Sequence, residues 1–281
     1  MRMFITTTIL CLLAVTASAQ EMVRLSWKLA PNESLRYQTI MNQIDEAQFS
    51  FDFPMLDTAN DPEAHDELES LLQEMNKAFD NVDFESVLTS ENEGIVDIVV
   101  KGIPKADDGA EPDPLQQMLS GVQLRGAVYT DGGLHSFWVK SSQKNLIALL
   151  FELPKEPVSI GDSWPLEVNF ISNDQNFQCA ASEKWGQATL VDLEKVEGET
   201  VAVIHYNFGE SVEGSFGLPG VTGETGEKPL SMMFTHQAVG RFSIDKGRWL
   251  VYDGLLRLKA DGFMNSNQKT KLTLKPHRAE G

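Results

Sequence analysis

The chain has 281 residues, 42% of them hydrophobic, and carries 41 acidic against 23 basic residues, for a net charge of −18. This charge repels a phosphate backbone and no basic run opposes it, so nucleic acid is excluded as an expected partner. A chain of this length can bury a sizeable core, either as one large β domain or as two smaller units.

Residues 1–19 have the features of a secretory signal peptide. Arg2 precedes an apolar stretch from Phe4 to Val15, and the run Ala-Ser-Ala at 17–19 places small residues where a signal peptidase requires them. The uncharged stretch is shorter than the about 20 apolar residues that cross a bilayer. We therefore expect cleavage after Ala19, export to the periplasm or the medium, and no retained transmembrane anchor.

The mature chain is strongly acidic and has a single cysteine. Loss of Arg2 leaves 22 basic residues against 41 acidic ones, a net charge of −19, and Cys179 is the cysteine that remains. A single thiol forms no internal disulfide, so the core must provide the stability. We expect Cys179 to be a buried and inert side chain, the usual role of a lone cysteine.

The first half of the mature chain predicts strands interrupted by helices. Asp61 is a good N-cap for a helix that begins at Pro62, and apolar residues recur at helical spacing to Phe79. The same Asp-Pro pattern at 113–114 predicts a short helix that Gly121 ends, and a third helix is predicted over 143–151. Alternating patterns predict strands over 35–41, 47–53, 82–89, 95–101, 122–130 and 134–140.

The second half is predicted to be almost entirely extended. The segment from Pro154 to Pro165 holds three prolines and is the expected junction. Strands are predicted over 164–171, 180–196, 200–208, 231–244, 248–260 and 268–275. The expected fold class is therefore α+β, mainly antiparallel β. Its expected units are 20–153, with the acidic helix over 62–79, and 154–281.

One spacing of glycine, aspartate and glycine occurs twice, at 126–133 and at 240–247. In both places a strand pattern enters and another leaves, as in a hairpin whose glycine adopts a left-handed conformation. The glycine that ends each motif is therefore expected at positive φ. Two readings stay open: two ordinary hairpins, or a duplicated unit covering 22–150 and 160–276.

The block Gly161-Asp-Ser-Trp164 is similar to the Gly-Asp-Ser-Leu block of a family of lipases and esterases. The serine of that family works with a histidine placed three residues after an aspartate, and none of the five histidines here has such an aspartate. We interpret the block as a turn in which Asp162 caps backbone amides and Trp164 enters the core.

No metal or cofactor motif is present. The histidines lack metal-ligand spacing, and the three in predicted strands, His135, His205 and His236, are expected to be hydrogen-bonded and partly buried. The segment 45–93 holds 15 acidic residues and one lysine, which leaves a weak surface calcium site open. No catalytic, cofactor-binding or metal residues are predicted.

Three blocks together resemble an uncharacterised group of exported bacterial proteins, a domain of unknown function that has the same Gly-Asp-Ser-Trp turn. They are Leu25-Ser-Trp-Lys with Glu33-Ser-Leu-Arg-Tyr-Gln, Leu153-Pro with Pro157-Val and Gly161-Asp-Ser-Trp, and Gly240 with Asp245-Lys-Gly. The resemblance covers most of the mature chain. It implies a location in the bacterial envelope and no activity.

Two functions remain as hypotheses. The first is a non-catalytic envelope protein whose sheets bind an apolar or lipid-like ligand or a protein partner, since the chain is β-rich and has 15 Phe and 10 Met but no catalytic motif. The alternative is a hydrolase whose active-site residues are scattered in sequence, centred on Ser163 or on carboxylates such as Asp131 and Asp245.

Overall fold

The chain is mainly antiparallel β-sheet in the residues that its computed structural model describes. These residues are 21–44, 48–51, 70, 82–90, 94–105, 114–139, 145–166, 168, 177–216, 228–262 and 264–277. The first group of elements is β1 (Ser34–Gln43), β2 (Gln48–Phe51), β3 (Val82–Thr89), β4 (Ile95–Pro104), α2 (Pro114–Leu119), β5 (Gly121–Tyr129), β6 (Leu134–Val139) and α3 (Asn145–Phe151). The second group is β7 (Ser163–Trp164), β8 (Phe177–Val196), β9 (Glu199–Phe216), β10 (Lys228–Ser243), β11 (Arg248–Gly262) and β12 (Met264–Pro276).

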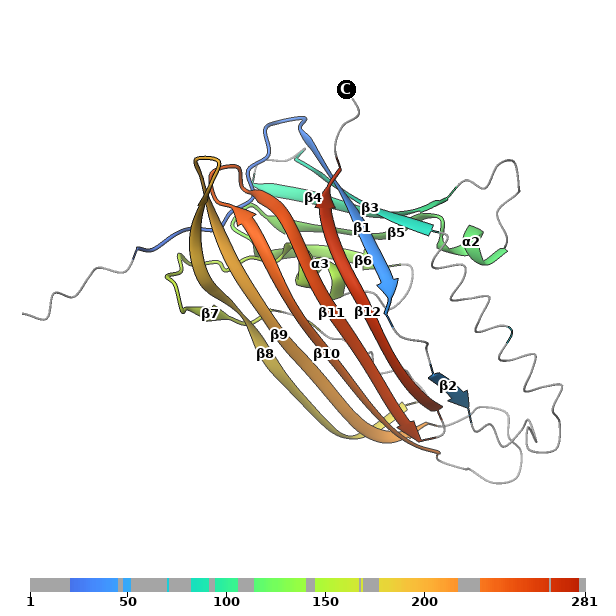
Figure 1. The fold of residues 1–281 in the computed structure, drawn as a ribbon. Helices are drawn as coiled ribbons and strands as arrows, with labels where there is room; N and C mark the ends of the chain where they lie inside the picture. Colours follow the sequence, from blue (N-terminus) through green and yellow to red (C-terminus); the bar gives the residue numbers. More distant parts are fainter. Residues whose placement is uncertain are drawn as a thin grey trace, which may run out of the picture.

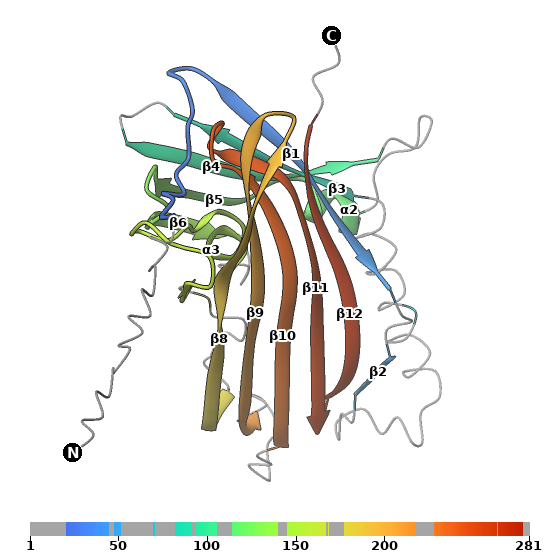
Figure 2. The ribbon, with the colours of Figure 1, turned by 60° about the vertical axis from the view of Figure 1, so that its left-hand side comes forward.

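All these strands belong to one sheet. Its order is β6-β5-β4-β3-β1-β12-β11-β10-β9-β8-β7, with β2 attached to β12 beside this path. Figures 1 and 2 show β8–β12 as a band of long, curved strands, with β3–β6 and α3 gathered at one end of it. The join between the halves of the chain is the antiparallel pairing of β1 with β12, from Tyr37↔Pro276 to Gln43↔Thr270.

Most of the predicted elements are confirmed. Strand β3 has the predicted bounds, and α2 begins at Pro114 and ends before Gly121, which has a φ of 74°. Strands β8 to β12 are longer than predicted, and β9 and β10 continue their pairing as far as Phe216 and Lys228. The strand predicted over 164–171 is wrong in its length, because β7 ends at Trp164 and the described residues 165, 166 and 168 are not in a strand. The predicted helix over 62–79 lies outside the described residues apart from Ser70, so the structure leaves the α+β assignment open.

The two predicted hairpins exist, but their glycines differ. Strands β5 and β6 pair antiparallel, as do β10 and β11, and Gly247 has the expected positive φ of 60°. The prediction for Gly133 is wrong: the positive φ, 98°, belongs to Gly132. A Cβ on Gly132 would lie 2.3 Å from the Cβ of Leu153, so the close approach of that segment requires this glycine.

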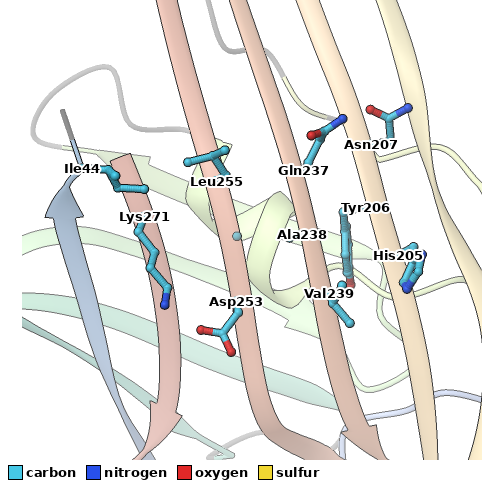
Figure 3. A pocket seen from close by; sticks show the side chains of 11 residues that line it. Ile44, His205, Tyr206, Asn207, Gln237, Ala238, Val239, Asp253, Leu255 and Lys271 are labelled. Carbon is cyan, nitrogen blue, oxygen red and sulfur yellow. The ribbon is translucent and has the colours of Figure 1, made fainter. Parts of the chain in front are cut away.

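The two halves of the chain share one main hydrophobic core, which lies on the face of the sheet that α3 covers (Figure 3). We call this the inner face and the opposite one the outer face. Trp27 and Trp249 donate their indole N–H groups to the carbonyls of Phe151 (2.9 Å) and Leu150 (2.6 Å). Phe242 packs edge-on against both indoles, with centroids 5.4 and 5.1 Å away. The indoles thus satisfy two carbonyls at the end of α3 that have no partner within the helix.

A segment before β1 connects the two glycine-aspartate-glycine turns. The amide of Trp27 donates to the carbonyl of Thr130 (2.8 Å), and the amide of Lys28 donates to that of Gly247 (3.1 Å). The Lys28 ammonium also donates to the carbonyl of Ile244 at 2.9 Å. We call residues 21–28 the N-terminal strap. It holds the tip of the β5–β6 hairpin beside the tip of the β10–β11 hairpin.

Candidate functional site: a groove on the outer face of the sheet

An open groove of about 600 Å³ crosses the middle of the long strands on the outer face. Figure 3 shows side chains such as Gln237, Leu255 and Lys271 on the near face of the sheet, with the helix behind it. Its surface is mainly apolar and is interrupted by a few polar groups, which is typical of a small-molecule binding site. The lining residues are Ile44, His205, Tyr206, Asn207, Gln237, Ala238, Val239, Asp253, Gly254, Leu255 and Lys271.

The register of four strands brings these side chains together. One row across the sheet pairs His205 with Val239 and Val239 with Asp253. The next row pairs Asn207 with Gln237, Gln237 with Leu255, and Leu255 with Lys271. Successive side chains of a strand point to opposite faces, so both rows lie on the outer face.

The apolar part of the groove is built from Val239, Leu255 and Ile44. Val239 and Ile44 are 41% and 54% exposed, so both present aliphatic surface to the solvent. Ile44 is held over β12 because its amide donates to the carbonyl of Lys269 at 2.9 Å. These side chains offer apolar surface that a ligand can remove from water.

The polar groups of the groove are largely available for a ligand. Thr273 donates its hydroxyl to Asp253 at 2.7 Å, which fixes that carboxylate. Among the described residues, no hydrogen bond or ion pair engages the side chains of Asn207, Gln237 or Lys271. The groove therefore presents amide and ammonium donors beside its apolar surface.

A rigid layer on the inner face supports the groove. His236 is fully buried, and its Nε2 shares a hydrogen bond of 2.5 Å with the hydroxyl of Tyr252, whose ring it stacks against. A Cβ on Gly254 would lie 2.6 Å from the His236 ring, so the glycine makes room for that ring. Burial lowers the pKa of His236 to about 4, which keeps this histidine neutral near pH 7.

The residues of the hydrolase hypothesis lie apart from the groove lining. Ser163 in β7 is exposed, and its hydroxyl is hydrogen-bonded to that of Thr189 at 2.8 Å. Asp162 accepts from the amide of Ser159 at 2.8 Å and Trp164 is buried, which confirms the interpretation of this block as a turn.

The two carboxylates of that hypothesis each stabilise a separate hairpin turn. Asp131 accepts from the amide of Gly133 at 3.2 Å, and Asp245 accepts from the amide of Thr200. The hydrogen bond from Thr200 lowers the pKa of Asp245. The structure therefore brings neither carboxylate together with Ser163 through a hydrogen bond.

The histidines and the cysteine depart in part from expectation. His135, His205 and His236 do lie in strands, but only His236 is buried. The expectation for Cys179 is wrong: its thiol is exposed, because β8 extends past the end of β7 at the border of the sheet. Residue type alone predicts burial, whereas the position of the strand in the sheet decides it.

Within the described ranges, no group of three or more histidine, cysteine, aspartate or glutamate side chains is placed to hold a metal ion. Much of the acidic segment 45–93 lies outside those ranges, so the calcium hypothesis stays open there. No helix in the same ranges is long and apolar enough to cross a membrane.

Comparison with known protein families and with curated proteins found no match to this chain.

Sequence reasoning did not find the groove. Its residues come from five separate segments, and no short motif contains them. The available signal was weak: the polar residues His205 and Asn207 alternate with larger apolar or aromatic ones in 204–208, but the same alternation occurs in any half-buried strand.

Proposed function

We propose that the chain is an exported, non-catalytic binding protein of the bacterial envelope, and that the outer groove takes a ligand with an apolar body and a polar end. The observation that supports this most directly is the groove itself, a largely apolar depression with exposed Val239 and Ile44 next to unengaged polar groups. Such a combination is the usual chemistry of a small-molecule site.

The proposed location in the bacterial envelope rests on the signal-peptide features of residues 1–19 and on the resemblance to exported bacterial proteins described above. N-terminal sequencing of the protein secreted by a bacterial host tests it. A mature chain that begins at Gln20 supports export by cleavage, and a chain that retains Met1 contradicts it.

Binding is tested by removing the apolar character of the groove without adding charge. The double variant V239Q/L255Q is expected to weaken binding of a single-chain amphiphile such as dodecanol at least roughly tenfold, because apolar contacts are lost. Isothermal titration calorimetry of the mature protein with dodecanol below its solubility limit measures this.

A matched control exists on the same strand. Met233 in β10 lies on the outer face but outside the groove, and its exposure of 43% is close to the 41% of Val239. The variant M233Q is expected to bind as the wild type does. Equal affinity of wild type, V239Q/L255Q and M233Q would contradict the proposal, as would hydrolysis of a panel of esters that S163A abolishes.

A further inference from the structure

Beside the groove, three basic side chains lie together on the outer face of β11 and β12. Arg257 is directly opposite Lys269, and Lys271, opposite Leu255, belongs to the next pair on the same face, two residues further along. We call Arg257, Lys269 and Lys271 the basic cluster. Like charges that face each other across a ladder destabilise a sheet, so this arrangement calls for an anion nearby.

The described residues of β10 and of the groove supply little negative charge to the basic cluster. On the neighbouring strand β10, the outward side chains from Ser231 to Val239 include no acid. Asp253 is the groove's one carboxylate, and the hydroxyl of Thr273 already binds it.

Two of the three cations are unpaired. In the described part of the chain, Arg257 and Lys271 form no hydrogen bond or ion pair through their side chains, whereas the nearby Lys259 is paired with Asp261 at 3.0 Å. The cluster is also unusual for a protein with a net charge of −18. A general excess of basic residues therefore does not explain it.

We infer that the ligand of the groove is a single-chain amphiphile with an anionic headgroup, and that Arg257 and Lys271 bind this headgroup. This inference rests on the proposed function. The apolar chain would lie along Val239, Leu255 and Ile44, and the headgroup would lie over β11 and β12, where Lys271 belongs to both the groove and the cluster. An oxyanion there would accept charge-assisted hydrogen bonds and relieve the repulsion between the cations.

Three amphiphiles of equal chain length test the headgroup. We expect the mature protein to bind dodecanoate roughly tenfold more tightly than dodecanol, and dodecylamine more weakly than either, since a charge-assisted hydrogen bond is worth about one decade of affinity. Added salt should weaken binding of dodecanoate and leave binding of dodecanol nearly unchanged.

Variants assign the effect to the cluster. R257Q/K271Q should bind dodecanoate about as weakly as it binds dodecanol. K101Q removes an exposed lysine of β4, far along the sheet from the groove, and is expected to bind all three ligands as the wild type does.

Four results would overturn the inference. Equal affinity for the three amphiphiles, with V239Q/L255Q still impaired, would leave the groove as a site and remove the anionic headgroup. Unchanged affinity for dodecanoate with a lowered Tm in R257Q/K271Q would mean that the cations pair within the chain. Binding to anionic vesicles without binding of monomeric dodecanoate would make the cluster a membrane contact. If none of the amphiphiles binds, the proposed function fails as well.

Discussion

The two faces of strands β9–β12 differ sharply although the same strands supply both. On the inner face Tyr206, His236 and Tyr252 are at most 2% exposed and pack ring against ring. On the outer face the next residues along, such as His205 and Gln237, are exposed. Neighbouring residues of one strand can therefore have different roles: one stabilises the sheet on the inner face, and the next can bind a ligand on the outer face.

The largest loss of stability is expected for a substitution on the inner face. Trp249→Ala should lower the free energy of unfolding by about 3–5 kcal/mol, because it removes a fully buried ring and leaves the carbonyl of Leu150 without its donor. Urea denaturation measures this. A loss of under about 1 kcal/mol would mean that the inner face is not the stabilising one.

The pH dependence of stability tests the role of a buried histidine on the inner face. His236 stays neutral in the folded chain down to a pKa of about 4, whereas its ordinary value is 6.5. The unfolded chain therefore binds more protons between these values, and stability should fall by about 3 kcal/mol as the pH drops from 6.5 to 4. Denaturation curves over this range, compared with those of His236→Gln, isolate the histidine.

A smaller loss of stability is expected for substitutions at the hairpin tips. Gly247→Ala should cost about 1–3 kcal/mol, because its φ is 60° and an added Cβ would lie 2.5 Å from the amide nitrogen of Lys28 in the N-terminal strap. Gly133→Ala should change stability by at most about 0.5 kcal/mol, since the nearest atom is the end of the Lys155 side chain at 3.1 Å. Thermal unfolding compares the two variants, and equal losses would contradict this difference between the turns.

The smallest expected effect on stability is on the outer face. Val239→Gln should change the free energy of unfolding by about 0.5 kcal/mol or less, because Val239 is 41% exposed and supports no buried group. Thermal unfolding beside Trp249→Ala gives the comparison. A loss above about 2 kcal/mol for Val239→Gln would show that the outer face is part of the stabilising structure.

The sequence predicted the elements better than their assembly. Strands such as β3 and helices such as α2 follow from alternation and capping, which depend on neighbouring residues. The groove depends on the order β9-β10-β11-β12 and on the pairing of Leu255 with Lys271, which no local pattern encodes. The error at Gly133 has a similar origin, because the need for a left-handed glycine at 132 comes from Leu153, a residue outside the turn.

The N-terminal strap sets an order of events during folding. Its Lys28 contacts Gly247, and β1 obtains one of its two neighbours only when β12 is present. For a chain exported from its N-terminus, these segments must wait for nearly the whole sequence to emerge, and closing such long loops is slow. Under the proposed export, the first residues to leave the membrane would be among the last to be fixed in place. Folding would then be coupled to export through the strap, and a chain shortened before β12 would keep the edge of β1 exposed to chaperones and proteases.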